Sequence, residues 1–274
     1  MFTLNCKGRL LVVDKPIVMG IINVTPDSFY SGSRQQSIDE VLRQAEQMLN
    51  DDATMLDMGG QSTRPGSQRL TADEELQRVL APLEQVRKRF PETYISIDTY
   101  LSKVAEETVK AGADIVNDIS AGTMDADMIA TVAGLNVPYV LMHMQGTPET
   151  MQAAPHYEDV TKEVLDFFIF KINELEKAGI KDIIVDPGFG FGKTIEHNFK
   201  LLHDLRAFQL LRKPVLAGLS RKATVYKTLG ITAGEALNGT TVLNTISLLN
   251  GASILRVHDV KEAKQAITLV NSMY

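Results

Sequence analysis

The chain has 274 residues, of which 44% are hydrophobic and 23% are charged, and its formal net charge is −6. This composition is ordinary for a globular protein, and the length fits one α/β barrel domain of about 250 residues. Basic residues are scattered along the chain, which argues against a nucleic-acid-binding protein. The acidic balance does not exclude an anionic substrate, because a local basic pocket can bind one.

The single cysteine, Cys6, excludes an intrachain disulfide, and we expect a reduced and inert thiol. Charged residues such as Lys7, Arg9 and Asp14 interrupt the apolar residues of the N-terminal segment, so this segment does not resemble a signal peptide. No apolar run approaches the roughly 20 residues that span a bilayer. We therefore expect a cytoplasmic protein without a membrane partner.

The predicted elements begin with a β-hairpin over Phe2–Asp14, with its turn near Lys7–Gly8, which we expect to close the bottom of a barrel. Eight short apolar runs follow, bounded by Gly or Pro, and this pattern is typical of strands that are covered on both faces. These predicted strands are Val18–Asn23, Ala53–Met58, Tyr94–Asp98, Asp114–Asn117, Pro138–His143, Asp182–Asp186, Pro214–Leu219 and Ser253–Val257.

Helical patterns lie between the strands, and three of them carry the capping-box spacing that marks the start of a helix. The three are Ser37-x-x-Glu40, Thr71-x-x-Glu74 and Thr232-x-x-Glu235. A strand followed by a helix, eight times over, predicts a closed parallel (β/α)8 TIM barrel in a single domain that spans residues 1–274. An open, doubly wound sheet is the alternative.

Polar residues stand at the end of nearly every predicted strand, where the active site of such a barrel lies. They are Asn23, Asp57, Asp98, Asn117, His143, Asp186, the trio Ser220–Arg221–Lys222, and Arg256 with His258. A single Asp at a strand end is often only a helix cap. So many polar groups at one rim indicate a functional site, because polar groups are costly to bury without partners.

Arg256 and His258 are two residues apart, so we predict that both side chains project to the same side of their strand. Together they would bind an anion. The alternative is that Arg256 pairs with Asp259 while His258 is solvated.

Asp98, Asn117 and Asp186 suit a flat heterocycle that is rich in N–H donors, because a carboxylate accepts paired hydrogen bonds from such an edge. The alternative for each of the three is that it caps the helix that follows. The sequence leaves both interpretations open.

The Gly-rich segment Asp186–Lys193 (DPGFGFGK) is similar to a phosphate-binding P-loop but does not fit that pattern. Pro187 stands where the P-loop needs a glycine, and Lys193 stands where G-x-G-x-x-G needs one. We interpret the segment as a loop whose backbone approaches a ligand, with Phe189 or Phe191 as an aromatic wall.

Two other loops, Asn23–Ser33 and Gly59–Ser67, are rich in Gly, Pro, Ser and Thr. Such loops near the end of a barrel are often mobile lids, and simple connections are the alternative. The five histidines and the single cysteine show no zinc-binding spacing, and Ser220 does not lie in a nucleophile elbow. We expect that a bound metal would be Mg²⁺, held by few protein oxygens together with phosphates and water.

Eight motifs, in order along the whole chain, resemble those of the dihydropteroate synthase family. They are Asn23–Phe29 (NVTPDSF), Ser62–Gly66 (STRPG), Asp98–Thr99, Asn117–Asp118, Leu141–Gly146 (LMHMQG), Asp186–Lys193, Ser220–Lys222 (SRK) and Arg256–Val260 (RVHDV). One such motif is a weak signal, whereas eight in register are highly specific.

The resemblance implies three groups of site residues. It implies that the pterin ring is held by Asp98, Asn117, Asp186 and Lys222, with Met142 packed on it. It implies that the diphosphate is bound by Asn23, Thr63, Arg64, Arg256 and His258, with Asn23 also reaching Mg²⁺. It implies that p-aminobenzoate is bound by Phe29, Thr63, Pro65, Phe191, Ser220 and Lys222.

The resemblance also implies a reaction of folate biosynthesis, in which 6-hydroxymethyl-7,8-dihydropterin diphosphate and p-aminobenzoate give 7,8-dihydropteroate and pyrophosphate. We predict a dissociative substitution without a covalent enzyme intermediate, since cations stabilise the leaving group and the neutral arylamine needs no general base. Sulfonamides, which mimic p-aminobenzoate, are expected to compete. The family further suggests a homodimer that binds neither nucleic acid nor membrane.

The sequence departs from the family pattern at three places. Ser31 replaces an Asp in the first loop, Gln61 replaces the Glu before Ser-Thr, and Ala223 replaces a Ser after the Arg-Lys pair. We expect any difference in loop closure or drug affinity to arise there.

Three other functions compete with this interpretation. The nearest is a pterin-barrel methyltransferase that passes a methyl group from a folate to a corrinoid protein, which does not need the trio Ser220–Lys222 or the anion clamp of Arg256 and His258. The others are a barrel that binds a pterin or phosphate without turnover and a phosphate-handling barrel isomerase.

Overall fold

The structure is a computed structural model that describes residues 1–24, 34–61 and 69–273, with the side chains of residues 34–37 left out. Two strands, β1 (Phe2–Cys6) and β2 (Arg9–Val13), form an antiparallel hairpin. The barrel strands are β3 (Ile17–Asn23), β4 (Met55–Gly59), β5 (Tyr94–Asp98), β6 (Ile115–Asp118), β7 (Tyr139–Met142), β8 (Ile183–Asp186), β9 (Leu216–Ala217) and β10 (Ile254–Val257).

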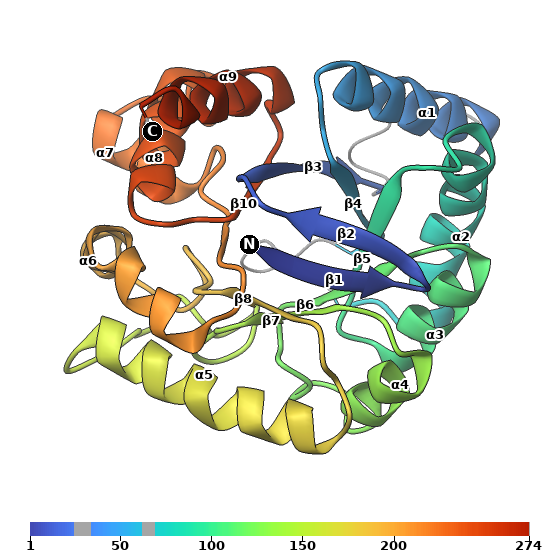
Figure 1. Cartoon of the computed structure of the whole chain (residues 1–274), viewed down its shortest axis with the longest axis horizontal. Coiled ribbons are helices and arrows are strands. Elements are labelled where there is room, and N and C mark those ends of the chain that lie inside the picture. Colours follow the sequence, from blue (N-terminus) through green and yellow to red (C-terminus); the bar gives the residue numbers. More distant parts are fainter. Residues whose placement is uncertain (25–33, 62–68, 274) are drawn as a thin grey trace.

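Helices surround the barrel, and in Figure 1 they form a ring around the strands. They are α1 (Arg34–Asn50), α2 (Ala72–Arg89), α3 (Ser102–Ala111), α4 (Met128–Leu135), α5 (Val160–Lys177), α6 (Ile195–His203), α7 (Ala223–Leu229), α8 (Leu237–Leu249), α9 (Val260–Asn271) and the 3-10 helix η2 (Leu205–Leu211). Among the described residues, none of these helices is both long and apolar enough to cross a membrane.

The eight parallel strands form one sheet in the order β8-β7-β6-β5-β4-β3-β10-β9, and the two edges of this sheet meet. Val185 in β8 pairs with Val215, which precedes β9, and the Val185 N–H donates to the carbonyl of Pro214 over 2.9 Å. The sheet therefore closes on itself, which confirms the predicted TIM barrel and excludes the open, doubly wound sheet.

The capping boxes have three different outcomes. Thr71 and Glu74 cap α2 reciprocally, as predicted, with the Glu74 N–H donating to Thr71 Oγ1 over 3.3 Å. Thr232 and Glu235 do hydrogen-bond, but they close a turn, and α8 begins only at Leu237, so that prediction of a helix start is wrong. Helix α1 begins at Arg34, before Ser37, whose side chain lies outside the described residues.

An apolar layer fills the lower half of the barrel, and we call it the floor layer. It consists of one residue from each of seven barrel strands, packed against four residues of the hairpin: Met19, Met55, Ile115, Val140, Ile184, Leu216 and Ile254, with Leu4, Cys6, Leu11 and Val13. The hairpin crosses this end of the barrel in Figure 1, which confirms its predicted position. Period-two alternation directs the same face of both hairpin strands into the barrel.

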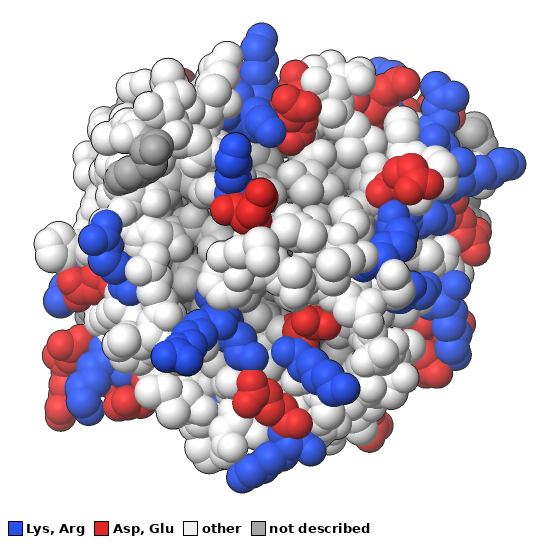
Figure 2. All heavy atoms as spheres, viewed as in Figure 1, with Lys and Arg blue, Asp and Glu red and all other residues white. Residues whose placement is uncertain are grey.

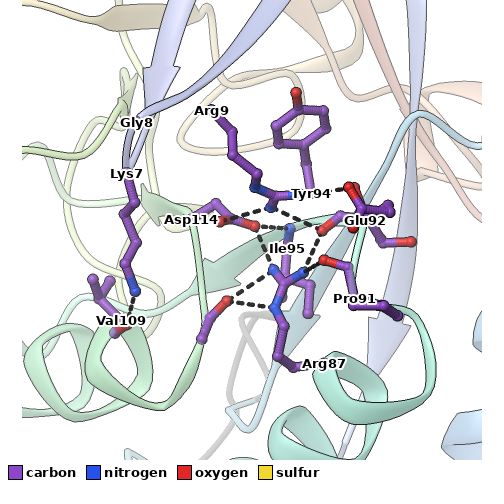
Figure 3. A network of polar contacts seen from close by, with 12 residues as sticks. Lys7, Gly8, Arg9, Arg87, Pro91, Glu92, Tyr94, Ile95, Val109 and Asp114 are labelled. Atoms are coloured by element: carbon purple, nitrogen blue, oxygen red, sulfur yellow. Dashed lines mark hydrogen bonds and ion pairs between the residues drawn. The ribbon is translucent and has the colours of Figure 1, made fainter.

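Polar contacts around Asp114 hold the hairpin to the barrel (Figure 3). The carboxylate of Asp114 accepts from Arg9 over 3.0 Å and from Arg87 over 2.5 Å, and it also accepts from the N–H of Ile95 over 2.9 Å. Lys7 Nζ donates to the carbonyl of Val109 in the last turn of α3. These contacts connect the hairpin to three elements: α2 through Arg87, β5 through Ile95, and α3 through Val109.

The charges on the hairpin-bearing face are of both signs. Figure 2 shows Lys and Arg side chains interspersed with Asp and Glu around its rim, with no extended area of one sign among the described residues of this face. Such a distribution offers no electrostatic footprint for a polyanion on this face.

Candidate active site

A second interior layer lies above the floor layer and follows from strand geometry. Side chains on a strand alternate between two faces, so a residue two positions after a floor residue also points into the barrel. Five strands thereby contribute the residues that we call the upper layer: Asp57, Asn117, Met142, Asp186 and Arg256. Four of the five are polar or charged, whereas the floor layer is apolar.

Arg256 lies at the centre of the upper layer and joins three strands. Its Nε donates to Asp57 Oδ2 and its Nη2 donates to Asp98 Oδ2, both over 2.6 Å. Asp57 is fully buried, and the side chain of Arg256 is only 18% exposed. The alternative in which Arg256 pairs with Asp259 is therefore wrong, and a different residue, Arg221, forms the bidentate pair with Asp259.

Asn117 extends this network, because its Nδ2 donates to Asp57 Oδ2 over 3.0 Å. Its neighbour Asp118 has a different role. The carboxylate of Asp118 accepts from the N–H groups of Ser120 and Gly122 and from the hydroxyl of Tyr139, at 2.7–2.8 Å. Asp118 is therefore a loop anchor, and Asn117 is the member of the pair that faces the barrel interior.

Asp186 and Lys222 lie on the other side of the barrel. Asp186 Oδ1 accepts from the N–H of Gly188 over 2.8 Å. Lys222 Nζ donates to the carbonyl of Phe189 over 2.5 Å and lies 4.7 Å from the ring centre of Phe191, in the range of a cation–π contact. Met142 is 2% exposed and packs in the same apolar cluster as Phe191.

The charged groups of the site perturb one another. Burial raises the pKa of Asp98 to about 7, with Asp57 adding to this effect and Arg256 opposing it. Burial lowers the pKa of Lys222 to about 8, Asp186 opposes this, and Arg256 adds to it. Burial alone would lower the pKa of Arg256, but Asp57 and Asp98 raise it above its usual range. Shifts of this kind, clustered at the C-terminal end of a barrel, are typical of an active site.

Ser220 and His258 meet at the rim of the barrel. Ser220 Oγ lies 3.0 Å from His258 Nδ1, and it accepts from the His258 N–H over 3.2 Å. The structure therefore places Ser220 against His258, while the guanidinium of Arg256 points to Asp57 and Asp98. Arg256 and His258 are thus held by different protein partners, although they are two residues apart.

The remaining predicted residues divide into two sets. Asn23 ends β3 beside Gly59 of β4 and lies at the same end of the barrel as the upper layer. Phe29, Thr63, Arg64 and Pro65, together with Ser31, lie outside the described residues. Gln61 is described: its Oε1 accepts from the Leu70 N–H over 3.3 Å, and its Nε2 donates to the hydroxyl of Tyr100.

Two features of the site were not identified from the sequence. Asp57 was recognised only as one of several strand-end acids, and its pairing with Arg256 depends on a register that no local pattern specifies. Lys193 was treated only as a mismatch to phosphate-binding motifs, whereas it is a buried lysine with four polar contacts. Side chains two residues apart on a strand point to the same face, so the apolar Met55 already indicates that Asp57 points into the barrel.

Comparison with known proteins places the chain in a family. The sequence profile of the pterin binding enzyme family matches residues 19–258. The chain therefore belongs to the pterin-binding enzymes.

Within that family, several relatives of this chain are dihydropteroate synthases. The enzyme of Escherichia coli K12 is 43% identical over 271 residues, which cover 98% of this chain and 95% of the relative. The enzyme of Haemophilus influenzae is 42% identical over 259 residues, 94% of each chain. These matches confirm the resemblance that the eight motifs indicated.

Solved structures agree in fold. The Yersinia pestis dihydropteroate synthase, in complex with a sulfonamide drug, matches with a TM-score of 0.93 at 38% identity over 99% of both chains. The Xanthomonas albilineans enzyme, in complex with 7,8-dihydropteroate, matches with a TM-score of 0.89 at 36% identity, over 99% of this chain and 98% of that one.

Proposed function

We propose that this chain is a dihydropteroate synthase, which condenses 6-hydroxymethyl-7,8-dihydropterin diphosphate with p-aminobenzoate. The product is 7,8-dihydropteroate, and pyrophosphate is released. The observation that carries the proposal is the upper layer, in which acids and an amide surround one arginine at the C-terminal end of a barrel of this family. The relatives of this chain carry the corresponding name.

The pterin is assigned to the interior. Asp98, Asn117 and Asp186 supply oxygens that accept from the N–H donors of the heterocycle, and Lys222 supplies a donor for its acceptors. Met142, buried beside this group, supplies an apolar surface for the flat ring. The neighbouring carboxylates favour positive charge on the pterin methylene.

The diphosphate is assigned to Asn23, Arg256 and His258, with Thr63 and Arg64. Arg256 already has two carboxylate partners, so it brings little net positive charge until the pterin takes over the hydrogen bonds of Asp98. His258 stands at the rim with Ser220, where a protonated imidazole would face the departing oxygens. These cationic donors stabilise the charge that develops on the leaving group.

p-Aminobenzoate is assigned to Phe191, Ser220 and Lys222, together with Phe29, Thr63 and Pro65. Lys222 and Phe191 are already in contact, and they offer a cation beside an aromatic wall. This pair suits a planar ring that carries a carboxylate. Sulfonamides resemble that ring in shape, so we propose that they compete for the same place. The Yersinia pestis enzyme forms a complex with a sulfonamide drug, which supports this proposal.

The chemistry follows from these positions. The bond between the pterin methylene carbon and the diphosphate oxygen breaks, and its electron pair leaves with pyrophosphate. The lone pair of the arylamine nitrogen then forms the new carbon–nitrogen bond, and one N–H proton passes to solvent. The amine is neutral at pH 7, so no general base is needed, and no bond to the protein forms.

Mg²⁺ is a proposed partner of the diphosphate. In the part of the chain that the structure describes, no cluster of three His, Cys, Asp or Glu side chains is suited to hold a metal. A magnesium ion held mainly by substrate oxygens and water needs few protein ligands, and the amide oxygen of Asn23 at the end of β3 fits that requirement. When bound there, the ion would neutralise charge on the leaving diphosphate.

The assay is pyrophosphate release by the purified protein with pterin diphosphate, Mg²⁺ and p-aminobenzoate. We expect release that requires p-aminobenzoate and that Lys222→Ala lowers at least 100-fold. Release that does not depend on p-aminobenzoate would indicate hydrolysis of the pterin diphosphate, and no release at all would favour the methyltransferase-like or the non-catalytic pterin barrel. A pterin–protein adduct trapped in a single turnover would contradict the dissociative mechanism.

Two further properties are proposed for the intact protein. Exposed apolar side chains on α7 and α8 (Leu229, Val242 and Leu249) support a homodimer, which light scattering of the purified protein would detect. The substrates support a cytoplasmic location, which fractionation of the source cells would test.

A further inference from the structure

Lys193 ends the Gly-rich loop of residues 186–193, and its side chain points away from solvent. The residue is 2% exposed. Its Nζ lies 3.0 Å from the carbonyl oxygens of Gly188 and Phe191 and 3.2 Å from that of His143. Burial lowers the pKa of Lys193 to about 7. A buried amine is costly unless its N–H donors have acceptors, and backbone carbonyls provide them here.

His143 supplies a fourth contact from the end of β7. Lys193 Nζ lies 3.0 Å from His143 Nδ1, and the imidazole ring packs edge-on against Phe167 at 4.9 Å. Burial and the charge of Lys193 lower the pKa of His143 to about 2, so the ring is neutral and its Nδ1 can accept from the lysine. Lys193 therefore links the Gly-rich loop to the strand beside it.

The loop approaches that strand end so closely that two of its residues have no room for a side chain. A Cβ at Gly188 would lie 1.9 Å from the carbonyl oxygen of His143, and one at Gly192 would lie 2.3 Å from that of Gln145. Both glycines also have positive φ, at 70° and 62°. The loop rests directly on the backbone of residues 143–145, and Lys193 holds it from beneath.

The same loop positions two groups of the proposed p-aminobenzoate site. The carbonyl of Phe189 accepts from Lys222, and the ring of Phe191 lies against the Lys222 ammonium. A shift of the loop would therefore move both the aromatic wall and the cation.

We propose that Lys193 is a positioning residue that sets the place of Phe191 and Lys222 for p-aminobenzoate. This inference rests on the proposed function, since it concerns how one of the two substrates is held. Lys193 touches no reacting atom, and its effect passes through the three carbonyls that it binds.

Other contacts hold the loop from its outer side. Asn198 Oδ1 accepts from the Gly190 N–H over 2.7 Å, the Tyr157 hydroxyl donates to the Gly192 carbonyl over 2.8 Å, and Gln152 donates to the Gly190 carbonyl over 2.6 Å. These contacts remain when Lys193 is replaced. A variant of Lys193 should therefore keep the overall position of the loop, while the backbone at Gly188 and Phe191 is held less precisely.

The test compares Lys193→Met, which keeps the length of the stem without its amine, with Lys181→Met, a matched change at an exposed lysine. We expect Lys193→Met to unfold cooperatively and to raise the KM of p-aminobenzoate about tenfold. The KM of the pterin diphosphate, which Lys222 also holds, should rise only about threefold, because Asp98, Asn117 and Asp186 still bind the pterin. Lys181→Met should behave as the wild type.

His143→Leu gives a second test that does not require Lys193→Met to fold. It removes only the imidazole contact and leaves the three carbonyls, so we expect a rise of about threefold in the KM of p-aminobenzoate alone. An unchanged KM of p-aminobenzoate in the folded variants, or an equal change for both substrates, would overturn the proposal. A wild type without aminobenzoate-dependent turnover would instead refute the proposed function.

Discussion

At the scale of single residues, Arg256 is held between the carboxylates of Asp57 and Asp98. This arrangement affects both the stability of the protein and its binding of ligand. Asp57 is fully buried, so its only compensation comes from Arg256 and Asn117 within the described network. Breaking one partner of a buried pair leaves an uncompensated charge, which costs about 3–5 kcal/mol. Asp57 therefore belongs to the site as a positioning residue for Arg256.

We predict that Asp57→Asn weakens binding of the pterin diphosphate about tenfold or more, because Arg256 loses one of the two carboxylates that fix its guanidinium. Isothermal titration calorimetry measures this directly. Asp166→Asn, at an exposed acid on α5, serves as the control and should bind as the wild type does. Unchanged affinity in Asp57→Asn would show that the pair does not position the arginine for this ligand.

Glu75 on α2 is a second buried acid, and its carboxyl group has no contact with solvent. It lies against Gly60, at the start of the second long loop. Burial raises its pKa from 4.5 to about 8. A hydrogen bond from Thr99 opposes this shift, Asp98 adds to it, and Arg78 opposes it. The native protein therefore holds a proton at neutral pH that the unfolded chain releases.

This retained proton gives a signed pH dependence. Between pH 4.5 and about 8 the native state binds more protons at Glu75 than the unfolded state, so the free energy of unfolding falls as the pH rises. We predict that Glu75→Gln removes this contribution, so the stability of the variant relative to wild type improves as the pH is raised through that window. Urea unfolding at several pH values tests it, and parallel curves for the two proteins would contradict a protonated Glu75.

At the scale of the elements, the hairpin of β1 and β2 depends on a few polar contacts as well as on its apolar face. Asp114 accepts from Arg9 of the hairpin and from Arg87 of α2. Cys6 lies fully buried beneath this network, and burial raises the pKa of its thiol to about 12, with Asp114 adding to the effect. A thiol in this state is inert toward alkylation, since the thiolate is the reactive form.

We predict that Asp114→Ala increases the alkylation rate of Cys6 by iodoacetamide at least tenfold, because the hairpin opens more often when both arginines lose their shared acceptor. Mass spectrometry after timed quenching measures the rate. Asp182 also receives a hairpin N–H, from Asn5 over 3.2 Å, so Asp182→Ala provides a milder second case. Equal alkylation rates in wild type and Asp114→Ala would mean that the apolar face alone holds the hairpin.

Sequence patterns predicted a strand or helix well where its first and last residues depend on local sequence alone. Tyr94–Asp98 matches β5, and the other strands are displaced by a few residues for physical reasons. Ala53 lies between α1 and β4, where its N–H donates to the carbonyl of Met48, and the predicted Pro214–Leu219 shortens to the two residues of β9. Pro214 has no N–H to donate, and a turn begins soon after Gly218.

The candidate site was predictable in position but not in pairing. The strand-end rule located Asp98, Asn117, Asp186 and Arg256 at one end of the barrel. The partners of Arg256 and the contacts of Lys193 depend on how strands and loops far apart in the sequence are aligned in space. Local patterns carry no information on that alignment, so the pairing of Asp57 with Arg256 and the contacts of Lys193 became evident only in the structure.

At the scale of the whole molecule, the barrel has one weak seam. β3, β4 and β5 pair over four or five residues, from Met19–Asn23 and from Met55–Met58, whereas β8 meets the β9 region through the single bridge of Val185 and Val215. Local stability follows the number of hydrogen bonds and buried contacts that must open together.

We predict that amide hydrogen exchange is slowest in β4 and β5 and at least tenfold faster at residues 214–217. Hydrogen–deuterium exchange with peptide mapping measures both regions in one experiment. Protection at the seam as strong as in β4 would show that the surrounding helices, and not the strand ladder, determine how the barrel opens.

The floor layer and the hairpin close one end of the barrel, so ligands reach the upper layer from the opposite end. A pterin held by Asn117 and Asp186, one layer above the floor, would then lie deeper in the barrel than p-aminobenzoate beside Phe191. The pterin diphosphate would therefore have to enter before p-aminobenzoate. The dihydropteroate product would leave through the same open end of the barrel.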